Sequence, residues 1–247
     1  MLIQDTSDIN LKGHKKTEGL GYCSEHIKGI KLHSCIAVSP SGVPYGSLGQ
    51  EYEARKEAKI SLSKAEKASR PIEEKESHRW IRMVQAITVK IPSHVSAITV
   101  CDREGDFYEL YAELSKLEMP FIVRVTHDRK SVNAEKIVSE LRKSQAFSRV
   151  IINILRDSWR NRPARQTEMQ IAYSYVAIAR PTKIKDENIA EVVTVNLVRI
   201  TELTTSDGDK PIEWILATSL PLFDHDDVMN VVEYYVQRWR KMPISAF

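Results

Sequence analysis

Short apolar runs alternate with amphipathic stretches over the first 145 residues and mark out the predicted elements. A strand opens at residues 2–3 and leads straight into Asp5. The turn "SGVP" joins two further runs, 30–40 and 44–52, which predicts a hairpin. The segments "AITVC" and "PFIVRVTH" have the continuous apolar character of strands buried on both faces. We therefore expect a sheet whose strands are covered by helices.

Amphipathic periodicity predicts the helices. One helix begins at Pro71 and carries an apolar stripe made of Trp80, Ile81, Val84 and Ile87. A second covers "DFYELYAELSKLE", a short one spans 133–143, and the last begins at Asp226. Residues 51–70 are polar and alternately charged, which is typical of an exposed linker or a ragged helix.

The pattern changes after residue 145. The segments "FSRVIINILR", "TEMQIAYSYVAIA" and "EVVTVNLVRI" are long runs rich in Val, Ile and Tyr, with no helical stretch between them. They predict an antiparallel β subdomain at 146–210, inserted between a first core part at 1–145 and a last part at 211–247. The fold class expected is α/β, a mixed sheet flanked by helices.

Composition narrows the class of protein. The 247 residues are 42% apolar and 28% charged, ordinary for a soluble globular chain with a sizeable core. No run approaches a membrane span, and "MLIQDTSDIN" does not resemble a signal peptide. Three cysteines without a CxxC spacing indicate reduced thiols and a cytoplasmic protein. A net charge of only +3 leaves any nucleic-acid binding to local clusters.

Two aspartates follow apolar runs and are candidates for a metal site. Asp5 and Asp102 would lie at one sheet edge if their strands were neighbours. A pair of carboxylates suits Mg²⁺, which prefers oxygen ligands, and such a pair can serve phosphoryl transfer. The alternative is that each aspartate only caps the segment that follows it.

The last helix places an aromatic and a cation together. Arg238 lies three positions after Tyr235, so a phenol and a guanidinium can share one edge that faces phosphate. The alternative is a core aromatic beside a solvated arginine. Val228, Val231, Val232, Tyr235 and Trp239 form the expected buried stripe.

Cations gather in two further segments. The stretch "LRDSWRNRPARQ" sets arginines around Trp159, and "THDRK" places His127, Arg129 and Lys130 at a strand end. Guanidiniums with an aromatic at a hairpin tip suit contacts with a phosphate backbone. A merely solvated loop is the alternative.

Taken in order, these stretches resemble the DDE transposases of bacterial insertion sequences, in the hairpin-forming cut-and-paste class marked by Tyr-x2-Arg-x3-Glu-x6-Lys. The matching segments are "IQDTSD", "EEKESHRW", "VCDREGDFYEL", "FIVRVTHDRKS", "NRPAR", "EWILATS" and "YVQRWR". They cover essentially the whole chain up to Arg240. The resemblance implies a ribonuclease-H-like core with a β subdomain inserted ahead of the third catalytic residue.

The resemblance also implies roles for individual residues. Asp5 and Asp102 match the first two acids, which with a Glu hold two Mg²⁺ ions (or Mn²⁺) for DNA strand cleavage and transfer. Tyr235 and Arg238 match the residues that contact phosphates, and Trp214 matches the aromatic that receives a flipped base. The basic surface for transposon-end duplex DNA would comprise Arg124, Arg129, Lys130, Arg160, Arg162 and Arg165.

The sequence departs from the family at both ends. Met242 stands where the signature requires Glu, and a thioether is a poor ligand for a hard cation. Pro243 then breaks the helix, and the signature Lys does not occur before Phe247. Only four residues precede Asp5, so we expect this chain to lack the family's N-terminal DNA-binding region, and likewise the C-terminal region that makes the homodimer. We expect a truncated, catalytically inactive transposase.

Three other hypotheses remain open. The chain could be a non-catalytic DNA-binding remnant that interferes with intact transposase. It could be a ribonuclease-H-like nuclease that uses Asp5, Asp102 and an acid foreign to the family. The reading frame could also yield no stable protein. The family implies a bacterial protein associated with the nucleoid, and no membrane partner is expected.

Overall fold

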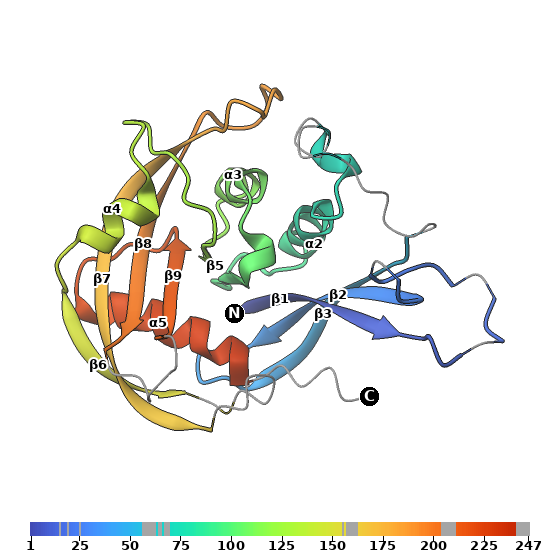
Figure 1. The fold of residues 1–247 in the computed structure, drawn as a ribbon, viewed down its shortest axis with the longest axis horizontal. Coiled ribbons are helices and arrows are strands. Elements are labelled where there is room, and N and C mark those ends of the chain that lie inside the picture. Colours follow the sequence, from blue (N-terminus) through green and yellow to red (C-terminus); the bar gives the residue numbers. More distant parts are fainter. Residues whose placement is uncertain are drawn as a thin grey trace.

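One sheet organises the protein. In the computed structural model, the described residues form nine strands in the order β3-β2-β1-β4-β5-β9-β8-β7-β6, and four α-helices in the same part of the chain cover the sheet (Figure 1). The residues that the structure describes are 1–14, 16–18, 20–24, 26–55, 63, 66, 70–154, 156, 163–203 and 211–240. Of these, Trp239 and Arg240 are described by their backbone only. The predicted mixed α/β class is confirmed.

The first five strands combine antiparallel and parallel pairing. β1 (Leu2–Asn10) pairs antiparallel with β2 (Gly29–Val38), which pairs antiparallel with β3 (Pro44–Glu53). On its other side β1 pairs parallel with β4 (Thr99–Cys101), and β4 pairs parallel with β5 (Phe121–Arg124). The carboxyl ends of β1, β4 and β5 therefore point the same way.

Four antiparallel strands extend the sheet beyond β5. β9 (Glu213–Thr218) pairs with β5 and β8 (Val192–Glu202), and β7 (Arg165–Ala179) lies between β8 and β6 (Ser148–Ile154). The three long runs after residue 145 are thus strands, as their β-branched composition predicts. They continue the same hydrogen-bonded sheet, because β9 joins β8 to β5.

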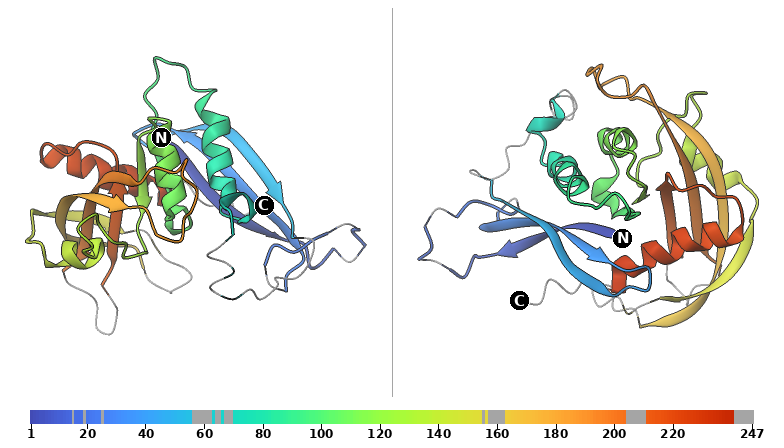
Figure 2. Two further views of the ribbon diagram at one scale, coloured as in Figure 1. Left: turned by 90° about the horizontal axis from the view of Figure 1, so that it is seen from above. Right: turned by 180° about the vertical axis from the view of Figure 1, so that it is seen from behind.

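Helices cover both faces of the sheet. α2 (His78–Thr88), α3 (Tyr108–Lys116) and α4 (Ile137–Lys143) contribute to one hydrophobic core, and α5 (His225–Arg240) contributes to the other (Figures 1 and 2). We call the side covered by the last helix the α5 face. Within the described residues, no helix combines the length and apolar character needed to cross a lipid bilayer.

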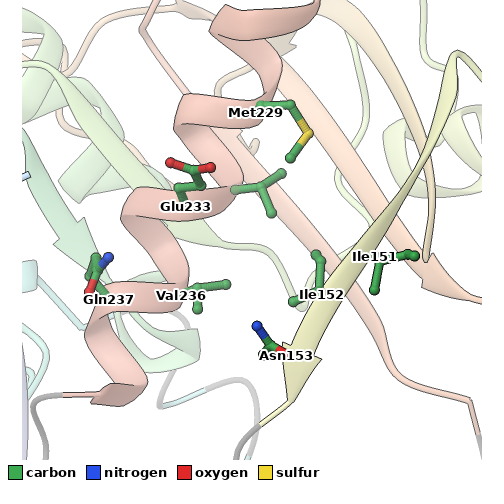
Figure 3. Close-up of a pocket in the computed structure, with 8 residues that line it drawn as sticks. Ile151, Ile152, Asn153, Met229, Glu233, Val236 and Gln237 are labelled. Atoms are coloured by element: carbon green, nitrogen blue, oxygen red, sulfur yellow. The ribbon is translucent and has the colours of Figure 1, made fainter. Parts of the chain in front are cut away.

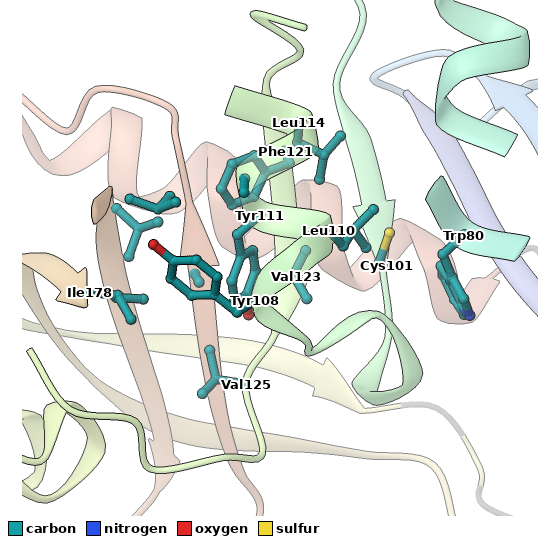
Figure 4. Packing of buried hydrophobic residues seen from close by; sticks show 14 of the residues in the cluster. Trp80, Cys101, Tyr108, Leu110, Tyr111, Leu114, Phe121, Val123, Val125 and Ile178 are labelled. Atoms are coloured by element: carbon teal, nitrogen blue, oxygen red, sulfur yellow. The ribbon is translucent and has the colours of Figure 1, made fainter. Parts of the chain in front are cut away.

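Alternation along β4 explains why this strand is apolar throughout. Val100 belongs to the core under α5, whereas Cys101 belongs to the core under α2 and α3. Successive residues of a strand point to opposite faces, so a strand covered on both sides needs apolar residues at every position. On the α2–α3 side, Tyr108, Tyr111 and neighbouring aliphatic residues fill the space above the sheet (Figure 4).

Three predicted element boundaries are wrong, and one of them is the start of the helix predicted at 133–143, because α4 begins only at Ile137. The helix expected from Pro71 is a single 3₁₀ turn, η1 (Ile72–Glu74), followed by extended backbone at Lys75, and α2 begins only at His78. The predicted apolar stripe of α2 is nevertheless buried. β1 also does not end near Asp5, because its pairing with β2 continues to Asn10 after its pairing with β4 has stopped.

Candidate active site

The period-two alternation of the strands places both aspartates on the α5 face. Ile3 and Val100 belong to the core under α5, and Asp5 and Asp102 follow each of them by two positions. Because β1 and β4 are parallel neighbours with Ile3 opposite Val100, the two carboxylates come to the same place. The predicted meeting of Asp5 and Asp102 is therefore seen in the structure.

Arg238 of α5 joins the two carboxylates. Its Nη2 donates a hydrogen bond to Asp5 Oδ1 and lies 3.2 Å from Asp102 Oδ2. The side chains of Asp5 and Asp102 are 17% and 23% exposed, and that of Arg238 is 6% exposed. We call Asp5 and Asp102 the carboxylate pair. A single buried cation therefore neutralises part of the charge of both acids.

The capping alternative holds for one aspartate only. Asp102 precedes the 3₁₀ turn η2 (Arg103–Gly105), and its Oδ1 accepts the backbone N–H of Glu104 at 2.8 Å. Its other oxygen, Oδ2, faces Arg238. Asp5 lies within β1 and starts no new element. Asp102 thus has both predicted roles at once, one for each oxygen.

Burial raises the pKa of two acids at this site, Asp5 and Glu104. The pKa of Asp5 is raised to about 6, because burial outweighs the lowering by the cation of Arg238 and the negative charge of Asp102 adds to the effect of burial. The pKa of Glu104 is raised as well, first by burial and then by Asp102. Desolvation of a carboxylate favours its protonated form, and a nearby cation reverses that preference. The ionised form of Asp5 therefore depends on the cation of Arg238 beside it.

The donor set fits a divalent metal ion. The carboxylate oxygens of Asp5 and Asp102 converge on one position and are hard ligands of the kind that Mg²⁺ and Mn²⁺ accept. Among the described residues, no group of three or more acidic, His or Cys side chains is arranged to hold a metal. The site therefore offers two protein carboxylates. Met242, at the position where the third is expected, lies outside the described residues.

Three more of the predicted DNA-contacting residues lie on the α5 face. Trp214 of β9 and Tyr235 of α5 meet edge to face with their ring centroids 5.7 Å apart, and both are buried. Arg124 follows Ile122 by two positions on β5 and so lies on the same side. Burial raises the pKa of Tyr235, and the cations of Arg124 and Arg238 partly offset the rise.

Tyr235 and Arg238 do not share an exposed edge. The alternative hypothesis was a core aromatic residue beside a solvated arginine. Tyr235 is indeed a fully buried core residue, but Arg238 is buried as well and is not solvated. The predicted phosphate contacts of both residues, and base stacking on Trp214, stay predictions. In this structure the indole packs against the phenol instead.

Asp106 is a buried carboxylate to which sequence analysis gave no role. Its oxygens accept hydrogen bonds from the hydroxyl of Tyr111 (2.7 Å), the hydroxyl of Thr126 (2.9 Å), the backbone N–H of His127 (2.8 Å) and Nη1 of Arg129 (2.5 Å). Burial by itself would raise its pKa, but Arg129 and these donors outweigh burial and lower it. Asp106 thus ties the turn after Asp102 to the segment that follows β5.

Several predicted DNA contacts have partners inside the protein. Arg129 is committed to Asp106, donating to its side chain and, at 2.6 Å, to its backbone carbonyl. Arg165 holds Glu202 through both carboxylate oxygens, at 2.9 and 3.1 Å. Lys130 is exposed, and its backbone forms an isolated β-bridge with Lys136. Arg160 and Arg162, together with Trp159, lie outside the described residues.

A separate groove of about 290 Å³ runs between α5 and β6 (Figure 3). Met229, Glu233, Val236 and Gln237 line it from α5, opposite Ile151, Ile152 and Asn153 of β6. Glu233 faces this groove, whereas Arg238 of the same helix reaches Asp5 and Asp102. Glu233 therefore does not add a third carboxylate to the candidate metal site at Asp5 and Asp102.

Gly105 sets how closely η2 approaches β4. A Cβ atom at this position would lie 2.7 Å from Cβ of Cys101. Gly105→Ala is therefore expected to destabilise the fold by about 1–3 kcal/mol, because the turn after Asp102 must shift. Urea unfolding measures the loss. Gly13→Ala is the matched control, since a Cβ there would meet nothing within 4 Å. Equal stability of the two variants would contradict the expectation.

Searched against models of known protein families, the chain matches none. The assignment of function therefore depends on the residues and their geometry.

Proposed function

We propose that the α5 face carries a DNA-processing site of the transposase class, built on a ribonuclease-H-like core. The observation that carries this proposal is the convergence of Asp5, Asp102 and Arg238, from three separate elements, at one buried point. These are residues for which the sequence resemblance predicts catalytic and phosphate-binding roles.

The order of the first five strands supports the finer fold assignment. β3-β2-β1-β4-β5, with β2 antiparallel to its neighbours and β4 and β5 parallel to β1, is the arrangement that a ribonuclease-H-like core requires. Ligand sites in such sheets gather near the carboxyl ends of the parallel strands. Asp102 lies directly after β4, where that rule places a site.

In this proposal Asp5 and Asp102 hold the divalent metal ion. When bound, such an ion activates a nucleophilic oxygen or stabilises the leaving oxygen in phosphoryl transfer. The protein supplies the two carboxylates, fixes Asp102 through the N–H of Glu104, and shields the site beneath α5. Arg238 provides a buried positive charge next to the same point.

The proposed activity of this chain is binding without efficient cutting. A two-metal mechanism needs carboxylates for both ions, and Met242 supplies no carboxylate at the third position. Two of the predicted DNA-contacting arginines, Arg129 and Arg165, are already paired with acids. We therefore expect modest affinity for duplex DNA, dominated by phosphate contacts.

Two measurements on the purified chain test the proposal. Fluorescence anisotropy with a labelled DNA duplex is expected to show binding that weakens steeply as salt rises, because phosphate contacts release counterions. Supercoiled plasmid incubated with Mg²⁺ or Mn²⁺ is expected to remain intact. Absence of salt-sensitive binding would overturn the proposal.

The same assays separate the competing nuclease hypothesis. Metal-dependent nicking that disappears in Asp102→Asn would show that the chain cuts DNA and needs Asp102 to do so. That outcome would replace the non-cutting transposase fragment by a ribonuclease-H-like nuclease. A contaminating nuclease would be recognised because its activity would survive in the Asp102→Asn preparation.

A further inference from the structure

The carboxylate pair already has a cation, supplied by the protein itself. Asp102 Oδ1 accepts the N–H of Glu104, and Asp102 Oδ2 lies 3.2 Å from Arg238 Nη2. Asp5 Oδ1 accepts a hydrogen bond from the same nitrogen. The guanidinium therefore contacts one oxygen of each carboxylate, at the position where a divalent ion that bridges the pair would bind.

Charge makes joint occupancy unfavourable. The two carboxylates carry two negative charges, of which the guanidinium already neutralises one. A divalent ion on the same oxygens would lie within a few ångströms of the guanidinium. Repulsion between cations is strong where little water screens it, and the Arg238 side chain is only 6% exposed. One cation must leave before the other can bind.

We propose that Arg238 is a built-in competitor of the divalent ion, an autoinhibitory contact that lowers the metal affinity of the carboxylate pair. The inference rests on the proposed function, which assigns the metal to Asp5 and Asp102. Metal loading then requires the guanidinium to swing away. The guanidinium is carried on a long side chain with several rotatable bonds, so it can move without a change in the helix backbone.

Binding of Mn²⁺ to the whole chain, followed by the electron paramagnetic resonance signal of free Mn²⁺, tests this competition without any activity assay. Arg238→Gln is expected to bind Mn²⁺ about tenfold more tightly than the unmodified chain, within the usual range of coupling between two sites. Arg142→Gln is the matched control. It removes an arginine that pairs with Glu213 at 2.5 Å, away from the carboxylate pair, and should leave Mn²⁺ affinity unchanged.

Chemical replacement of the missing side chain gives a second readout. In Arg238→Ala, low millimolar guanidinium chloride is expected to weaken Mn²⁺ binding by refilling the vacated position, whereas sodium chloride at equal ionic strength should not. The unmodified chain should respond equally to the two salts, since its own guanidinium is in place. A purely structural role of Arg238 would give no such difference.

The outcomes separate the inference from the proposed site. If Asp102→Asn abolishes Mn²⁺ binding but Arg238→Gln binds no more tightly than the unmodified chain, the competition is refuted and the metal site stands. If Mn²⁺ binds none of the proteins, or binds Asp102→Asn as well as the unmodified chain, the proposed site fails and the inference fails with it. Should Arg238→Gln not fold, Arg238→Met removes the positive charge but keeps much of the side-chain length, and an affinity no higher than that of the unmodified chain refutes the competition.

Discussion

Asp106→Ala is expected to destabilise the protein by about 3–5 kcal/mol, the usual cost of removing one partner from a buried ion pair. The Asp106 side chain is fully buried, and its loss leaves the guanidinium of Arg129 and the hydroxyl of Tyr111 without their acceptor. The backbone N–H groups of Thr126 and His127 lose theirs too. Buried donors without acceptors are costly because they have also lost their water.

Urea unfolding at neutral pH measures this loss. Asp8→Ala is the matched control, since Asp8 pairs with Lys31 at 2.7 Å on the surface and exposed ion pairs contribute little. Because the turn after Asp102 is tied to the segment after β5 through Asp106, the variant should also lose Mn²⁺ binding at the carboxylate pair. A stability within 1 kcal/mol of the control would show that the network is dispensable.

His33 is expected to make the stability depend on pH. Its ring is buried, hydrogen-bonded to Thr6 (2.9 Å) and Gln4 (3.1 Å), and 4.6 Å from the ring of Trp80. Burial, with the cations of Arg79 and Arg82 next in importance, lowers the pKa of His33 from 6.5 to about 3. Between pH 6.5 and about 3, the imidazole of residue 33 therefore binds a proton in the unfolded chain but stays neutral in the folded chain. This contribution to stability is complete above pH 6.5 and is lost as pH falls towards 3.

Comparison with His33→Gln isolates the effect. Asp5, with a raised pKa of about 6, works in the opposite direction, because the folded state then holds a proton that the unfolded state releases. Because Asp5 is present in both proteins, its contribution cancels when the unfolding free energy of His33→Gln is subtracted from that of the unmodified chain at each pH. On lowering the pH from 7.5 to 5, the unmodified chain should lose about 2 kcal/mol more unfolding free energy than the variant. Parallel pH profiles would refute the assignment, and His94→Gln, which alters an exposed histidine, should follow the unmodified chain.

Much of the candidate site could be predicted from alternation alone. Ile3 with Asp5, and Val100 with Asp102, are spaced by two, so each aspartate shares a face with an apolar residue of a buried strand. The same periodicity predicts the buried stripe of α5, of which Val228, Val231 and Tyr235 are almost fully buried. These features are local in sequence, and local patterns reflect the geometry of strands and helices directly.

Features that depend on distant segments could not be predicted in this way. The hydrogen bond between Arg238 and Asp5 joins residues 233 positions apart. Arg129 was expected on the DNA, but it turns inward to Asp106, a residue whose burial no local pattern reveals. The boundary of β1 was missed for the same reason, because the partner strand β2 extends the pairing to Asn10.

The sequence by itself determined the α/β class, the identity of most strands and helices, and the acidic and basic residues of the candidate site, because periodicity and side-chain type are properties of short segments. Only the tertiary structure decided which of those residues meet. It brought Asp5 and Asp102 together through the parallel pairing of β1 and β4, and it placed a guanidinium between them by packing α5 on that face. Contacts of this kind depend on how the chain closes over long separations, which no local sequence pattern specifies.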